Sequence, residues 1–160
     1  MSQALDAELK SRLAGRVCFI AIGNPDHGDD GFGPSLGQAL QQRGHTEVVL
    51  AGTTPEAHTG QVRAGGWDAV ILLDAVEVGA APGAVVVLDT EQLVSRFPQF
   101  STHKLSLGTL ARLIEADEGP KVSLLGAQPA SLKGPGLSPV IEETVRLLAE
   151  LLDKILSQTA

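Results

Sequence analysis

A chain of 160 residues, 43% hydrophobic and 19% charged, is long enough to bury a sizeable core, which excludes a disordered protein. Its net charge of −7 includes no block rich in Lys or Arg, so we expect neither nucleic acid nor an anionic membrane surface as the main partner. The one cysteine, Cys18, excludes an internal disulfide and a cysteine-rich metal site.

The first element in chain order is residues 1–13, which we expect to be a helical extension at the N-terminus of the domain. This segment mixes charged and apolar residues and lacks the apolar run of a signal peptide. No later stretch reaches the roughly 18 uninterrupted apolar residues that cross a bilayer. We therefore predict a single domain over residues 1–160, with no membrane insertion and a cytoplasmic location.

Five short runs rich in Val, Ile and Leu predict β-strands, and helical patterns lie between them. Most of these runs are apolar without alternation, which is typical of strands covered on both faces. The predicted strands are Val17–Ile22, Glu47–Ala51, Ala69–Leu73, Ala84–Leu88 and Val122–Leu125. The predicted helices are Gly33–Gln42, Leu105–Ile114 and Pro139–Leu156, and Ser138 is a good N-cap for the last. Alternating strands and helices predict a layered α/β domain.

One connection predicts the direction of a strand. Only about ten residues separate Asp74 from Ala84, whereas a parallel return needs a dozen or more, usually with a helix. The connection also contains Gly79, Pro82 and Gly83, which favour turns. We therefore expect the Ala84–Leu88 strand to run antiparallel in an otherwise mostly parallel sheet.

The segment Gly23–Gly33 directly follows the first strand and holds the densest group of polar residues. Its sequence GNPDHGDDGFG places three carboxylates and one imidazole in five consecutive positions. Crowded like charges cost energy unless a cation or solvent relieves them. Asp29 or Asp30 would alternatively cap the helix that follows. A phosphate is a poor guest, because neither nucleotide-binding glycine motif is present and three acids would repel it.

Two further residues lie where an α/β sheet places its ligand crevice. Asp74 ends a buried strand, where it would either face the first loop or form an Asx-turn with the following residues. His103 precedes a predicted helix, where it would be a ligand, a cap or a surface residue. His27 is a reserve candidate, and His45 and His58 have less to recommend them. Two carboxylates and an imidazole suit a divalent cation such as zinc or nickel.

At these residues the sequence resembles the hydrogenase maturation peptidases, the nickel-dependent proteases of the HybD/HycI type. The resemblance spans about residues 17–156 and rests on four blocks in order. They are Gly23–Gly33; Asp74-Ala75-Val76 with Gly79 and Pro82-Gly83; Ser101-Thr102-His103-Lys104-Leu105; and Gly126-Ala127-Gln128-Pro129 with Leu137-Ser138-Pro139.

The resemblance implies a three-layer α/β/α sandwich around a five-stranded sheet. It also implies a metal site formed by Asp30, Asp74 and His103, the positions that match the family's metal ligands. The family often has Glu where this chain has Asp30, so this side chain is shorter by one methylene. A second departure is Leu50, which stands where members often have the acid of an Asp-x-Gly-Thr block.

The implied function is removal of the C-terminal extension from a [NiFe] hydrogenase large-subunit precursor. Nickel would be presented by this substrate rather than bound permanently, and Asp30, Asp74 and His103 would complete its coordination. Cys18 lies inside a predicted strand and is expected to pack as a small apolar residue. Two alternatives stay open at this point: a general metallopeptidase or amidase with a permanent metal, and a non-catalytic chaperone that handles nickel.

Overall fold

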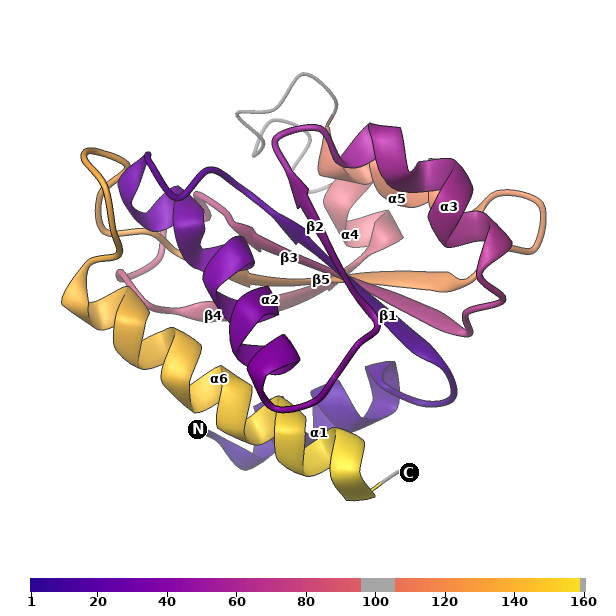
Figure 1. The fold of residues 1–160 in the computed structure, drawn as a ribbon, viewed down its shortest axis with the longest axis horizontal. Helices are drawn as coiled ribbons and strands as arrows, with labels where there is room; N and C mark the ends of the chain where they lie inside the picture. The colour runs from indigo at the N-terminus through magenta and orange to yellow at the C-terminus, as the bar shows by residue number, and fades with distance from the viewer. Residues whose placement is uncertain (96–105, 159–160) are drawn as a thin grey trace.

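The computed structural model describes residues 1–95 and 106–158 and contains one five-stranded sheet between two helical layers (Figure 1). The helices, including two 3-10 turns labelled η, and the strands follow in the order α1 Gln3–Arg12, β1 Val17–Ile22, η1 Gly28–Gly31, α2 Phe32–Gln42, β2 Val48–Gly52, η2 Pro55–His58, α3 Thr59–Ala64, β3 Ala69–Ala75, β4 Val85–Asp89, α4 Thr90–Ser95, α5 Leu107–Glu115, β5 Lys121–Ala127 and α6 Pro139–Gln158. This architecture confirms the predicted α/β/α sandwich.

The strands lie in the order β2-β1-β3-β5-β4. The pairs β1–β2, β1–β3 and β3–β5 are parallel, and β4 runs antiparallel to β5. The predicted direction of the fourth strand is therefore correct, since the short connection from β3 leaves no room for a crossover helix. The sheet partner of β4 is β5, which inserts between β3 and β4.

Each face of the sheet carries its own apolar core. Residues of β1 alternate between the two cores, with Phe19 on one side and Ile20 on the other. Helices α1, α2 and α6 cover the first face, and α3, α4 and α5 cover the second (Figure 1). Because both faces are covered, every residue of β1 is buried, which explains why its sequence is continuously apolar.

The predicted strands agree with the observed ones to within two residues at each end. The helix predicted over Leu105–Ile114 begins at Leu107, because the Ser106 hydroxyl accepts a hydrogen bond from Thr109 N and caps it. The helix after Ser138 begins at Pro139 as predicted, and Glu142 N donates to Ser138 O.

The helices α3 and α4 escaped sequence-based prediction. Helix α4 follows a reciprocal cap, in which Gln92 N donates to Asp89 Oδ1 and Asp89 N donates to Gln92 Oε1. This arrangement is a capping box, and the Asp-x-x-Gln spacing in the sequence was a readable signal for it. Each of these helices has six residues in the described part of the chain, too few for a clear 3.6-residue pattern.

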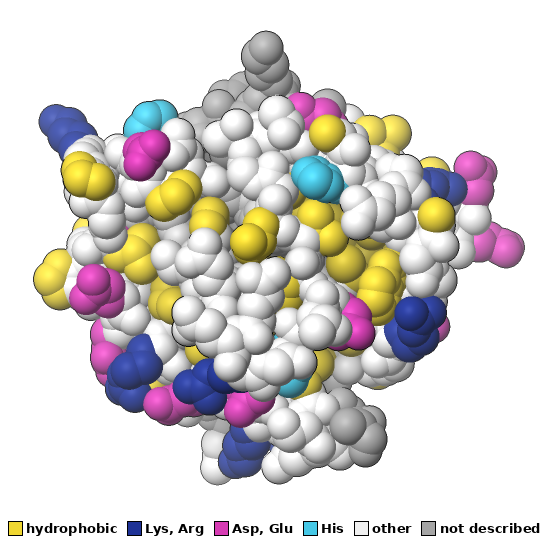
Figure 2. Space-filling model, viewed as in Figure 1, with side chains coloured by type: hydrophobic (Ala, Val, Ile, Leu, Met, Phe, Trp, Pro, Cys, Tyr) yellow, Lys and Arg dark blue, Asp and Glu magenta, His cyan; other side chains and the backbone are white. Residues whose placement is uncertain are grey.

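Charged side chains of both signs are intermixed around the lower margin of the face drawn in Figure 2. The described ion pairs include Arg146 with Glu143 and Glu150 on α6, all about half exposed. Such exposed pairs add little to stability. No helix of the described residues is long and apolar enough to cross a membrane.

Candidate functional site

The candidate site lies where the parallel strands β1 and β3 end. Because β1 and β3 pair in parallel, the loop after β1 and the last residues of β3 lie at the same edge of the sheet. Gly23 begins this loop with a φ of 136°, a conformation that other residues rarely adopt. A side chain at Gly23 would also collide with the main-chain oxygen of Asp30, so the glycine allows the loop to fold back on itself.

Gly33 brings the start of α2 directly onto the ends of both strands. A Cβ atom at this position would overlap the carbonyl oxygens of Ile22 in β1 and Leu73 in β3. Asp30 lies three residues before Gly33, and Asp74 directly follows Leu73. The 3-10 turn η1 that contains Asp30 accordingly contacts β3. Two of the three predicted site residues therefore lie on neighbouring segments at one edge of the sheet.

The Asp30 carboxyl group is held from one side only. Its Oδ2 accepts a hydrogen bond of 2.8 Å from Asn24 N, and its main-chain N donates to His27 O at 3.1 Å. The residue is 9% exposed. Within the described part of the chain, its second carboxyl oxygen accepts no hydrogen bond. Asp30 thus combines an orientation fixed by Asn24 N with a second carboxyl oxygen that could serve as a metal ligand.

Asp74 lies inside β3 and is 1% exposed. It pairs with Gly126 of β5, one residue beyond the point where the ladder with β1 ends at Leu73. The alternative of an Asx-turn would need the Val76 N–H, but this group donates to Ala127 O at 2.9 Å. Asp74 is therefore an internal strand residue, and its carboxyl group is buried at the edge where the loops gather.

The third predicted member, His103, lies outside the described residues, and the shared three-residue site stays a prediction. Across residues 1–95 and 106–158, no three His, Cys, Asp or Glu side chains form a group that could hold a metal ion. Of the other histidines, His27 is exposed and His45 contacts Asp153 Oδ1 at 2.8 Å. The donor set of two buried carboxylates fits a divalent cation that brings further ligands with it.

Asp29, next to Asp30 in the chain, has a structural task instead. Its carboxylate accepts hydrogen bonds from Ala130 N, Ser131 N, Ser138 N and the Ser138 hydroxyl, all between 2.7 and 3.1 Å. Burial alone would raise the pKa of Asp29, but these bonds hold that pKa below its usual value. Asp29 therefore caps no part of α2; it ties the first loop to the segment that leads into α6.

The sequence did not identify Asp29 or Gln128 as structural supports of this edge. Gln128 directly follows β5 and is 4% exposed. Its side-chain amide accepts hydrogen bonds from backbone N–H groups of the segment that follows Asp74. A buried amide after an apolar strand was the available signal, since such a group must find partners. The partners of Asp29 are more than a hundred residues away, and no local pattern indicates them.

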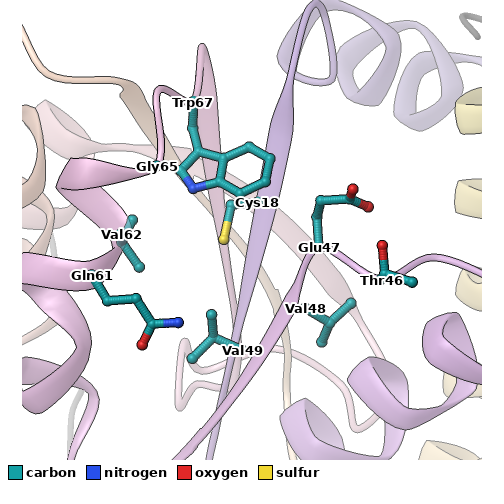
Figure 3. Close-up of a pocket in the computed structure, with 9 residues that line it drawn as sticks. All are labelled: Cys18, Thr46, Glu47, Val48, Val49, Gln61, Val62, Gly65 and Trp67. Atoms are coloured by element: carbon teal, nitrogen blue, oxygen red, sulfur yellow. The ribbon is translucent and has the colours of Figure 1, made fainter.

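A cavity of about 310 Å³ lies elsewhere, near the amino ends of β1 and β2 (Figure 3). Figure 3 shows Cys18 beside the indole of Trp67, and Val49 and Gln61 line the cavity from other segments. Burial, assisted by the negative charge of Glu47, raises the pKa of Cys18 to about 11. This thiol stays protonated at neutral pH and is a poor nucleophile, so we do not assign the chemistry to this cavity.

Comparisons with known proteins agree with one another. A family model described as hydrogenase maturation protease matches residues 33–155. The Hydrogenase 3 maturation protease of Escherichia coli K12 is 30% identical over 113 residues, which cover 69% of this chain and 71% of that protein. The crystal structure of the [NiFe] hydrogenase maturation protease HycI from Thermococcus kodakarensis KOD1 superposes with a TM-score of 0.82 at 30% identity, covering 94% of this chain and 99% of that one. The maturating endopeptidase HybD of E. coli gives a TM-score of 0.71 at 26% identity, covering 91% and 94%.

Proposed function

Because this chain belongs to the hydrogenase maturation protease family, we propose that it removes the C-terminal extension from the precursor of a [NiFe] hydrogenase large subunit. Membership makes it a hydrolase. The observation that carries the finer proposal is the pair of buried carboxyl groups, Asp30 in η1 and Asp74 in β3, on two segments that are in contact at one edge of the sheet. The proposed place of action is the cytoplasm.

In this proposal nickel belongs to the substrate and is the signal that the precursor is ready. Asp30 and Asp74 would offer carboxyl oxygens to nickel already held by the precursor, and His103 would offer an imidazole nitrogen. Such a metal polarises a peptide carbonyl or lowers the pKa of a bound water. The contribution of this chain is to orient the ligands: Asn24 N fixes Asp30, and β5 fixes the backbone of Asp74.

The sparse ligand set supports a substrate-borne metal over a resident one. Two carboxylates and one imidazole lack the paired histidines that commonly hold zinc in peptidases. A metallopeptidase with a permanent metal would instead contain a stoichiometric metal after purification. A non-catalytic chaperone would leave the size of the precursor unchanged. Metal analysis and the mass of the incubated precursor therefore separate the three functions.

The test is to incubate the protein with nickel-loaded and nickel-free precursor and to follow the loss of the C-terminal extension. We expect cleavage of the loaded form only. Asp30→Asn, Asp74→Asn and His103→Ala should each slow cleavage on the order of 100-fold or more, because a metal contributes several kcal/mol to the transition state.

His45→Ala and His58→Ala serve as matched controls and should cleave at nearly the normal rate. His45 contacts Asp153 of α6, and His58 ends η2, so neither side chain belongs to the proposed ligand set. Equal cleavage of nickel-free and nickel-loaded precursor would contradict the proposal, as would full activity of Asp30→Asn.

A further inference from the structure

Gln128 makes a dense set of hydrogen bonds to the segment that follows Asp74. Its Oε1 accepts from Val78 N at 2.8 Å and from Ala80 N at 3.3 Å. Its Nε2 donates to Glu77 Oε1 at 2.7 Å and to Pro129 O at 3.4 Å. A side chain that is 4% exposed therefore uses both ends of its amide.

The backbone around Gln128 binds the same segment at both of its ends. At the start, Val76 N donates to Ala127 O; at the finish, Gly83 N donates to Gln128 O, and Gln128 N donates to Ala84 O, each at 2.9 Å. The loop of residues 76–84 is thus attached to the end of β5 at its beginning, middle and end. We call this loop the clamp loop.

Asp74 depends on β5 more than the rest of β3 does. The ladder between β1 and β3 ends with Ala21 opposite Leu73, whereas the ladder with β5 continues through Asp74 and Ala75. Of the described strands, only β5 pairs with Asp74. The backbone that carries this carboxyl group is therefore fixed on one side by the strand that leads into Gln128.

We propose that Gln128 is a positioning residue, which holds the clamp loop against β5 and so fixes the direction of the Asp74 carboxyl group. This inference rests on the proposed function, in which Asp74 approaches nickel borne by the precursor. Without the amide, Val78 N and Ala80 N would lose their acceptor, and the middle of the clamp loop would move away from β5 while the backbone bonds at its two ends remain. The end of β3 would then loosen on the side where it pairs with β5.

The pair formed by Glu77 and Gln128 allows a donor–acceptor swap. In Gln128→Glu, two carboxylates face each other, and the donor to Glu77 is lost. In Glu77→Gln, the new amide can turn its oxygen toward Gln128 Nε2, so little changes. In the double variant, the acid at 128 accepts from the two backbone N–H groups and from the amide at 77, and the charge of the pair is unchanged.

The experiment measures kcat and KM for cleavage of nickel-loaded precursor by these three variants, well below their thermal midpoints. We expect Gln128→Glu to lower kcat about 10–100-fold, as loss of an outer support of a metal ligand does, with KM within about twofold. Glu77→Gln should be nearly normal, and the double variant should recover most of the lost kcat. A purely structural role would lower the thermal midpoint and leave the kcat of the folded protein unchanged.

Normal kcat in Gln128→Glu overturns the inference, and so does a folded double variant that fails to cleave. If Gln128→Glu does not fold, the double variant decides alone, because it keeps the bonds to Val78 N, Ala80 N and residue 77 and loses only the 3.4 Å bond to Pro129 O. Asp30→Asn is measured in the same assay to keep the two proposals apart. An inactive Asp30→Asn beside an active Gln128→Glu rejects the positioning role only, whereas an active Asp30→Asn rejects the proposed function.

Discussion

Asp29 and Asp30 are neighbours with opposite tasks, and their hydrogen bonds explain the difference. Both carboxylate oxygens of Asp29 accept hydrogen bonds, from four donors in the segment that leads into α6. Its negative charge is therefore balanced without a cation. Asp30 uses one oxygen on Asn24 N. The crowding of acids in this loop therefore indicates one structural and one candidate functional carboxylate. The sequence alone does not tell which of the two carboxylates is structural, because both lie in the same loop after the first strand.

Cys18 gives a prediction that depends on pH. Its pKa of about 11 in the folded protein exceeds the usual 9.0, so the folded protein holds the thiol proton more tightly. At pH 8 the thiolate fraction is about 100-fold lower than in the unfolded chain, and iodoacetamide should react at least that much more slowly. The same shift contributes stability that is fully present below pH 9 and is lost as the pH rises toward 11.

The control for this prediction is Cys18→Ala, which should cleave precursor normally while losing some stability, because the residue packs in the second core. Equal alkylation rates in the folded and urea-unfolded protein would contradict the buried thiol. A folded Cys18→Ala protein that cannot cleave would contradict the proposed metal-based mechanism instead.

At the scale of elements, the strands were predictable because burial on both faces leaves a continuous apolar run. The start of α5 was shifted by its Ser106 cap, and α3 and α4 were too short to show a period. The position of β5 was not predictable in this way. Its insertion between β3 and β4 depends on which apolar edges meet in space, and the sequence pattern of a strand does not name its neighbours.

The contact between α2 and the strand ends can be tested through two glycines. Gly33→Ala places a methyl group against the carbonyl oxygens of Ile22 and Leu73, so α2 must move away from β1 and β3. We expect the free energy of unfolding to fall by about 1–3 kcal/mol or more, and cleavage to fall as η1 moves with the helix.

Gly60→Ala is the matched control, because Gly60 lies exposed in α3 and a methyl group there meets nothing within 4 Å. Alanine favours a helix over glycine, so this change should raise the free energy of unfolding by about 0.5–1 kcal/mol. Urea titration measures both variants. Equal stabilities of Gly33→Ala and Gly60→Ala would show that α2 does not rest on the strand ends.

At the scale of the whole molecule, α1 is part of the first core. Leu9 and Leu13 are 1% and 0% exposed and belong to the cluster that joins α2, α6 and the sheet. Within the segment expected to be an extension, Gln3–Arg12 is a helix. The burial of this helix gives it a role in stability that the mixed composition of residues 1–13 did not indicate. Its end is also tied to the sheet, because Arg12 Nη1 donates to the Ser123 hydroxyl at 3.3 Å.

Leu9→Ala should therefore lower the free energy of unfolding by about 2–5 kcal/mol, because it leaves a cavity among packed helices. Leu113→Ala removes the same atoms from α5, where the side chain is 47% exposed, and should cost much less. Thermal or urea denaturation of the two variants measures the difference. A loss at Leu9 no larger than that at Leu113 would mean that α1 is dispensable for the core.

The insertion of β5 has a consequence for how the protein is made. A ribosome releases β4 before β5, yet β5 supplies the pairing of β4 and the second neighbour of β3. At translation rates of about 5–20 residues per second, the edges of β3 and β4 that pair with β5 stay unpaired on the order of seconds, until residues 121–127 are made. The nascent chain is most prone to aggregation during this interval. Asp29 gains its partners later still, so a complete candidate site exists only after Ser138 has been synthesised.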